Sequence, residues 1–258
     1  MSDKKVMNDK KVMNDMRDIC FASGVVACLE NKLLSKSKRE ELGSAKDLET
    51  LRPLLADTPY NDLNLENPLK ETFDLLKEIA PIFYDFFSLR FEAHDAKILY
   101  RYMTGELKEE ETKELLFTKR ELRGIEDMDP IKKAMPDFPM TTIDKYYFEQ
   151  IFSIYRQIPI VRDVLKIEID QANMRSFLRL GKVEEKIFIE NGDLDRSKLS
   201  EISVERNLDE EEKEKIERKL EDERYLVVGH EPVFRYFYRK FDEISFVREI
   251  ITLKRAGL

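Results

Sequence analysis

The chain has 258 residues, of which 53 are acidic and 45 basic, so its net charge is −8. This balance disfavours a nucleic-acid partner, because such partners are bound by clusters of Lys and Arg. No apolar run approaches the roughly 20 residues that a membrane-spanning helix needs, so we expect no span. Eight Gly, nine Pro and no Trp argue against a turn-dense all-β fold. Leu, Glu and Lys are abundant instead, and all three favour helices.

Residues 16–34 form the first apolar stretch with helical spacing. A tandem copy of Asp-Lys-Lys-Val-Met-Asn precedes it over 3–8 and 9–14, and its polarity indicates a helix end or a frayed tail. Cys20 and Cys28 have no His nearby, so they match neither a zinc site nor a redox motif. We expect both to be buried helix residues. A lipoprotein-type cleavage site before Cys28 is disfavoured, because the residues before it are rich in Asp.

Start and stop signals mark further helices at short intervals. The start signals are capping residues or prolines with a preset φ, and they are Asp47, Asn67-Pro68, Asp129-Pro130 and Thr141-Thr142. The stretch 209–224 has mainly charged residues around Ile216 and Leu220, which is typical of a solvated helix with ion pairs four residues apart. Only 158–161 and 225–228 resemble strands. The sequence therefore predicts an all-α fold.

The organising feature of the sequence is an internal repeat of about 75 residues. Three prolines define it, and an acid follows each proline after eleven positions and a base after sixteen. The prolines are Pro81, Pro159 and Pro232, the acids are Glu92, Asp170 and Glu243, and the bases are Lys97, Arg175 and Arg248. A glycine follows each copy at intervals of 76 residues, at Gly105, Gly181 and Gly257. Shared apolar positions have the spacing of one helix face, so the repeat predicts three long helices.

The repeated acid and base stand five residues apart, so they point in different directions from one helix. We therefore expect each to reach a neighbouring helix or its backbone ends, and thereby to fix how the repeated units dock. A structural role for these charges is favoured over a catalytic one.

The motifs of common enzyme chemistry are missing. The sequence has no phosphate-binding glycine-rich loop, no metal-ligand spacing and no nucleophile motif, so we expect no catalytic residue, cofactor or metal. His94 and His230 are interpreted as structural. His94 adjoins Asp95, but adjacent helical residues point about 100° apart, so Asp95 is poorly placed to orient His94 as a general base. Clusters of Phe and Tyr favour helix packing over stacking with nucleic acid.

Six stretches of the chain carry a resemblance to one family. They are Lys32-Leu-Leu-Ser, Leu55-Ala-Asp-Thr-Pro-Tyr60, Arg90-Phe-Glu-Ala-His-Asp-Ala-Lys97, Asp144-Lys-Tyr-Tyr-Phe148, Glu168-Ile-Asp-Gln-Ala-Asn-Met-Arg175 and Lys254-Arg-Ala-Gly-Leu258. They follow one another in the family's order from about Phe21 to the last residue. Together they resemble the C-type stalk protein of the archaeal-type (A-type) and V-type rotary ATPases, which is the counterpart of the d-type stalk protein of the eukaryotic vacuolar ATPase.

Members of that family are all-helical funnels of three similar units around a pseudo-threefold axis. With the repeat, the resemblance predicts three units and a preceding segment, 1–28, that packs as a tail and helix on the third unit. The units are 29–104, 105–180 and 181–258. The resemblance also adds Asp95 and Asn173 to the docking positions, whereas the third unit has Phe246 in their place.

Family members join the soluble rotor shaft to the ring of membrane-embedded proteolipids and pass rotation between them, while other chains handle ATP. The resemblance thus implies a non-catalytic central-stalk component of an ATP-driven ion pump or an ATP synthase. It leaves open the direction of the reaction and the choice of H⁺ or Na⁺. It implies a cytoplasmic location, peripheral to the membrane, with one copy per complex and a monomer when isolated.

Two other hypotheses fit parts of the sequence. A generic α-helical-repeat adaptor would form an open superhelix in which units contact only their sequence neighbours. An enzyme that uses His94 or His230 would need a deep pocket with converging titratable groups.

Overall fold

The computed structural model describes residues 18–61, 63, 65–115, 140–185, 187–201, 208–222 and 225–257. All regular structure in these ranges is helical, and they contain no strand, which confirms the all-α prediction. The two stretches that resemble strands were predicted wrongly. Pro159 begins a helix, because its fixed φ suits a first helical turn, and residues 225–228 form an irregular connection.

The chain divides into two compact bodies. The first body consists of Met1–Tyr84 and Glu223–Leu258, and the second body is Asp85–Asp222. The first body therefore combines segments that are far apart in the sequence. The division into three units and their funnel arrangement both stay predictions.

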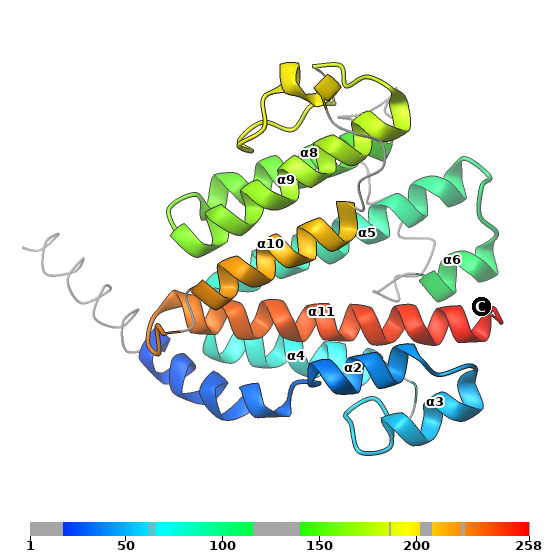
Figure 1. Ribbon diagram of the computed structural model, residues 1–258, viewed down its shortest axis with the longest axis vertical. Coiled ribbons are helices and arrows are strands. Elements are labelled where there is room, and N and C mark those ends of the chain that lie inside the picture. The colour runs from blue at the N-terminus through cyan, green and yellow to red at the C-terminus, as the bar shows by residue number, and fades with distance from the viewer. Residues whose placement is uncertain are drawn as a thin grey trace, which may run out of the picture. The chain divides into compact units, whose positions relative to one another are not determined.

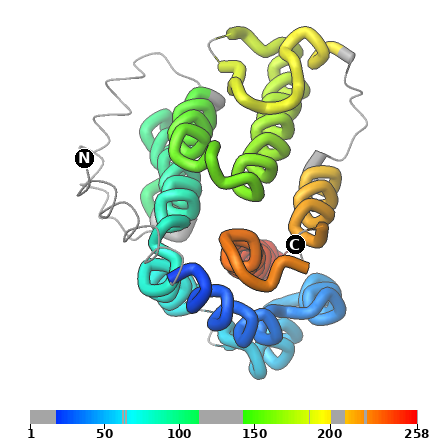
Figure 2. Tube along the Cα trace, turned by 90° about the vertical axis from the view of Figure 1, so that its left-hand side faces the viewer, coloured from blue at the N-terminus to red at the C-terminus, as the bar shows by residue number. Residues whose placement is uncertain are grey.

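The first body is built around one long helix, α11 (His230–Arg255). Its other elements are a helix over 18–29, η1 (Glu30–Lys32), α2 (Lys36–Gly43), α3 (Leu48–Leu55), α4 (Glu66–Ile79) and η2 (Pro81–Phe83). α11 packs on α3 and α4, and its buried residues Val233, Phe237 and Phe241 recur at the spacing of one helix face. Figure 2 views α11 nearly end-on, with the helix over 18–29, α2 and α3 curving around it.

Local signals explain where these helices begin. Asp47 caps α3 as predicted, because its carboxylate accepts the backbone N–H of Thr50 at 2.8 Å while the Thr50 hydroxyl accepts from the backbone N–H of Asp47. α4 begins at Glu66, two residues before Pro68, so the proline lies within the first turn and costs no hydrogen bond.

The second body contains α5 (Tyr84–Met103), which begins one residue before it, and further helices. These are α6 (Glu109–Leu115), α8 (Met140–Tyr155), α9 (Pro159–Leu180), η4 (Arg196–Glu201) and α10 (Leu208–Asp222). α9 packs on α8, α10 and η4, and Figure 1 shows α8 running beside it. Buried Ala96 of α5 packs with Ile143 and Tyr147 of α8.

Two further predictions can be compared with helices of the second body. α8 begins at Met140, next to the predicted start at Thr141-Thr142, and the start at Asp129-Pro130 lies outside the described residues. The solvated helix expected over 209–224 is α10, with Ile216 and Leu220 buried.

Cys20 and Cys28 were predicted wrongly: both lie on the helix over 18–29, but both are exposed free thiols. This helix buries Ala22 and Val26, which lie four residues apart on one face. The cysteines occupy the opposite, solvent-facing side, where an apolar side chain gives no packing.

Candidate functional site

The three long helices that the repeat predicts are present, with a proline near the start of each and a glycine just after its end. Pro81 opens η2 directly before α5, Pro159 is the first residue of α9, and Pro232 is the third residue of α11. After each helix comes a glycine in the left-handed region, with φ of +79° at Gly105, +71° at Gly181 and +75° at Gly257. A side chain with a Cβ disfavours this conformation, which accounts for glycine at each of the three positions.

The repeated acid of α11, Glu243, is the centre of a buried polar cluster in the first body. Its side chain is completely buried, and it accepts three hydrogen bonds. The donors are the backbone N–H of Leu34 at 2.5 Å, the hydroxyl of Tyr60 at 2.5 Å and Nζ of Lys240 at 2.8 Å. Three donors satisfy a buried carboxylate that would otherwise be very costly to desolvate.

Two tyrosines near Glu243 have perturbed acidity. Burial, followed by the negative charge of Glu243 and its hydrogen bond, raises the pKa of Tyr60 far above its ordinary value. Burial and the same charge raise the pKa of Tyr236 to about 12. Both phenols therefore resist ionisation more than an exposed phenol does.

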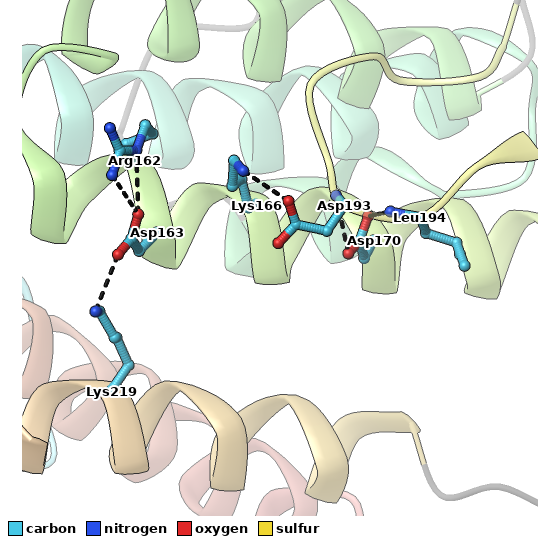
Figure 3. Close-up of polar contacts among 7 residues, drawn as sticks. All are labelled: Arg162, Asp163, Lys166, Asp170, Asp193, Leu194 and Lys219. Carbon is cyan, nitrogen blue, oxygen red and sulfur yellow. Dashed lines mark hydrogen bonds and ion pairs between the residues drawn. The ribbon is translucent and has the colours of Figure 1, made fainter.

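The repeated acid of α9, Asp170, makes the equivalent contact in the second body. Its carboxylate accepts the backbone N–H groups of Asp193 and Leu194 at 3.2 and 2.9 Å, as Figure 3 shows. Gly192 allows this approach, because a Cβ at that position would lie 2.0 Å from Oδ1 of Asp170. Burial raises the pKa of Asp170, and the two N–H groups partly offset the effect.

Glu243 and Asp170 thus do the same thing at the same repeat position. Each accepts the backbone N–H of a leucine in a loop, Leu34 in one body and Leu194 in the other. The loops precede short helical elements, α2 and η4. In these two copies, the repeated acid fixes a loop to the long helix.

The first copy of the repeat differs. Glu92 is half-buried on α5, and its side chain makes no hydrogen bond or ion pair with the other residues that the structure describes. The loop after α5 folds back on its own helix, where the N–H groups of Glu106 and Leu107 both donate to the carbonyl of Arg101. The structure therefore gives Glu92 no equivalent, among the described residues, of the contact that Asp170 and Glu243 make.

The added docking position lies three residues after the acid, and its contacts are described for α9 and α11. Asn173 is buried, and its amide accepts from the N–H of Ile189 at 2.9 Å and donates to its carbonyl at 2.8 Å. Asp95 is buried on α5. Phe246 lies under the guanidinium of Arg39, 5.5 Å from its ring centre, so a cation–π contact to α2 replaces the polar one.

The repeated bases reach neighbouring helices of the second body. Lys97 of α5 forms an ion pair with Asp144 of α8, and Arg175 of α9 forms one with Glu212 of α10. Arg248 is half-buried on α11. The described contacts of the repeated charges join elements within one body, and their role in docking repeated units stays a prediction.

Sequence reasoning missed several of the polar partners. Arg90 of α5 and Glu168 of α9 pair at the same repeat position, nine residues after the proline, but the third copy has Phe241 there, so no repeated charge marked it. Arg235 on α11 pairs with Glu30 at 3.0 Å. Tyr60 lies within one of the stretches that carry the family resemblance, and this was the only signal for it.

Neither histidine lies in a metal-binding cluster of the residues that the structure describes. His230 packs edge-on to the ring of Phe83, with centres 5.9 Å apart, and His94 is half-buried on α5. Among the described residues, no three His, Cys, Asp or Glu side chains are placed to hold a metal ion. No described helix is long and apolar enough to span a membrane.

Comparison with protein-family models and with curated proteins finds no match for this chain.

Proposed function

We propose that this protein is the central-stalk adaptor of an archaeal-type or V-type rotary ATPase, joining the soluble shaft to the proteolipid ring. In this role it transmits torque and performs no chemistry. Its location is cytoplasmic, peripheral to the membrane through the complex, in one copy per rotor.

One observation carries the proposal: three long helices at the spacing of the sequence repeat, each followed by a glycine with φ between +71° and +79°. A pseudo-threefold funnel would contain such a repeat of long helices. The proposed arrangement places the three units around one axis, with the shaft end in the centre.

The polar contacts suit a part that carries load. Glu243 and Asp170 fix loops to long helices through backbone N–H groups, and such contacts resist sliding better than apolar packing alone because hydrogen bonds are directional. Charged residues beside the shaft would set orientation and association rate, and apolar contacts would supply more of the affinity.

A generic helical-repeat adaptor is the second candidate. The favouring observation is that the described contacts of the repeated charges join elements within one body. A solenoid would show the same neighbour contacts. The two candidates differ in their partner, so a binding experiment separates them.

The test is reconstitution with purified rotor parts. The full chain is mixed with purified shaft proteins, and separately with the detergent-solubilised proteolipid ring, and both mixtures are studied by size-exclusion chromatography and native mass spectrometry. We expect a one-to-one complex with the shaft and one copy bound to the ring. A well-folded chain that binds neither contradicts the rotor proposal and favours the generic adaptor.

A second measurement tests the absence of chemistry. Because the sequence has no phosphate-binding loop, calorimetry with ATP and magnesium is expected to show no binding. Micromolar binding of ATP would contradict the non-catalytic role.

A further inference from the structure

The loop that leads into η4 is anchored to α9 on both sides of one dipeptide, Asn191-Gly192. Before the dipeptide, the backbone N–H and carbonyl of Ile189 both bond to the buried amide of Asn173, at 2.9 and 2.8 Å. After it, the next two backbone N–H groups donate to the carboxylate of Asp170, as Figure 3 shows. The dipeptide is therefore a short turn between two fixed points on one helix.

Asn-Gly is the pair of residues in which an asparagine side chain reacts most readily with its own backbone. The glycine has no Cβ to keep its nitrogen away from the side-chain amide, and the ring closes within one chain, so no second molecule has to be brought in. Asn191-Gly192 is the only such pair in the sequence. Asn191 is exposed, and neither its side-chain amide nor the N–H of Gly192 makes a hydrogen bond with any residue that the structure describes.

The anchor at Asp170 itself requires glycine at position 192. A Cβ there would lie 2.0 Å from Oδ1 of Asp170, so a larger residue would push the loop away from this carboxylate. Asn191 has a φ of +76°, in the left-handed region that Asn adopts more readily than most residues other than glycine. The geometry that fixes the loop thus favours both members of the reactive pair.

We infer that Asn191 is a site of deamidation, and that the reaction frees the loop from Asp170 as the protein ages. The backbone nitrogen of Gly192 gives up its proton and attacks Cγ of Asn191, so that a new C–N bond forms. The bond from Cγ to the side-chain nitrogen breaks, and this nitrogen leaves as ammonia with the proton that Gly192 gave up. The product is a cyclic imide.

Water then opens the imide at one of its two carbonyls. Opening at Cγ leaves ordinary aspartate, and opening at the main-chain carbonyl leaves isoaspartate, in which the backbone runs through the side chain. Water is the only co-reactant, and no atom is oxidised or reduced. The inference does not depend on the proposed rotor function.

Isoaspartate would change the length of the turn between the two anchors. It adds one methylene to the backbone, while Asn173 and Asp170 stay at their fixed spacing on α9. The bonds of Asn173 to Ile189 are buried, whereas those that Asp170 accepts are exposed or partly buried. Water can replace the second set at lower cost, so we expect the contacts with Asp170 to be lost first.

Incubation of the folded full chain at neutral to mildly alkaline pH, followed by peptide mass spectrometry, tests the reaction. Deamidation gives the mass gain of an amide converted to an acid, and enzymatic methylation of isoaspartyl carboxyl groups identifies isoaspartate. We expect Asn191 to react about tenfold faster than Asn31, which corresponds to about 1.4 kcal/mol in activation free energy. Asn31 is also exposed, but Lys32 follows it, and its Cβ hinders the attack. Asn191 that reacts no faster than Asn31 overturns the inference.

Two variants separate the reaction from its consequence. Asn191→Gly keeps the left-handed φ but has no side-chain amide, so its loop peptide should show no mass gain and no isoaspartate. Asn191→Asp carries the new negative charge on an unaltered backbone, so it is the matched control for isoaspartate.

Hydrogen exchange then measures whether the loop is freed. In the isoaspartate form, isolated by chromatography, the amides of Asp193 and Leu194 should exchange about tenfold faster than in the fresh chain, because each loses its hydrogen bond to Asp170. In fresh Asn191→Asp they should exchange as in the wild type. Unchanged exchange in the isoaspartate form, or an equal increase in fresh Asn191→Asp, overturns the inference that the altered backbone frees the loop.

Discussion

The hydroxyl oxygen of Tyr60 lies 2.5 Å from Oε1 of Glu243, although 183 residues separate them in the sequence. Nζ of Lys240 lies 2.8 Å from each of these two atoms. The phenol, the ammonium and the backbone N–H of Leu34 thus converge on one buried carboxylate. The cluster therefore links the chain around Leu34 and around Tyr60 to α11 within the first body.

Removal of the Glu243 carboxylate is therefore expected to destabilise the protein strongly. Glu243→Gln should lower the free energy of unfolding by about 3 kcal/mol, because it leaves the Lys240 ammonium buried without its counter-charge. Tyr60→Phe removes one donor and should cost about 1–2 kcal/mol. Urea unfolding followed by circular dichroism measures both.

The control for this pair is Asp242→Asn. Asp242 pairs with Arg39 at a more exposed position, 41% exposed at the acid, where an ion pair contributes about 1 kcal/mol or less. If Asp242→Asn lowers the free energy of unfolding as much as Glu243→Gln does, the buried cluster contributes no more to stability than this exposed ion pair.

Substitution of Gly192 should detach its loop from α9. In Gly192→Ala, the new Cβ would lie 2.0 Å from Oδ1 of Asp170, so the loop must move away and both N–H contacts to Asp170 are lost. We expect a loss of about 1–3 kcal/mol in the free energy of unfolding. Amides of Asp193 and Leu194 should exchange faster.

Gly24→Ala is the matched control. Gly24 lies inside the helix over 18–29, and a Cβ there meets nothing within 4 Å. Alanine favours helix over glycine by about 1 kcal/mol, so this substitution should be neutral or stabilising. Equal losses from both substitutions would show that the clash at Asp170 does not matter.

Alkaline pH is expected to unfold the chain, because buried phenols ionise more easily in the unfolded state than in the folded state. The folded state raises the pKa of Tyr60, and it raises those of Tyr155 and Tyr236 to about 12, from an ordinary value of 10. Their contribution to stability is complete below pH 10 and is lost as the pH rises above it. The chain has ten Tyr and no Trp, so phenolate absorbance can be followed without Trp interference.

The expected titration includes a late phase, in which the phenols with a raised pKa ionise as the fold is lost. Tyr60→Phe should shrink this late phase. A single phase near pH 10 would mean that the phenols are accessible in the folded protein.

Charge reversal at Arg175 tests whether the repeated bases serve folding or partner binding. Arg175→Glu places a third acid beside Glu212 and Glu168, so we expect a loss of about 2 kcal/mol. Binding to the shaft proteins, measured per folded molecule, should change less. A stably folded Arg175→Glu chain that has lost only shaft binding would assign Arg175 to the partner surface instead.

Lys182→Glu provides the comparison for that experiment. Lys182 is 77% exposed and pairs with Glu184 at 3.2 Å, so its reversal should change stability by less than about 1 kcal/mol.

The helices could be predicted because their signals are local. Asp47 marked the start of α3, and the repeated prolines and glycines marked the limits of α5, α9 and α11 to within a few residues. Each signal acts through the backbone φ of one residue or through a capping side chain, so it does not depend on tertiary contacts. The cysteines were predicted wrongly because apolar character alone does not say which face of a helix meets the core.

The candidate site could be predicted only in part. The repeat identified Asp170 and Glu243 as acids that reach other elements, because equivalent positions shared a charge. It did not identify Tyr60 or Leu34, since a hydrogen-bond partner chosen by tertiary packing has no fixed distance in sequence. For Glu92 the repeat predicted too much. Glu92 shares the repeated charge, but the loop after α5 donates its N–H groups to the carbonyl of Arg101 and not to Glu92.

The contact between Glu243 and Leu34 also sets an order of events during synthesis. Leu34 leaves the ribosome 209 residues before its acceptor does, so α2, α3 and α4 are made long before the helix around which they pack. Until α11 is complete, the apolar faces that these helices turn toward it have no partner. Such long-range closure slows folding and leaves a nascent chain open to aggregation. A chain truncated before His230 should therefore depend on chaperones and be degraded rapidly.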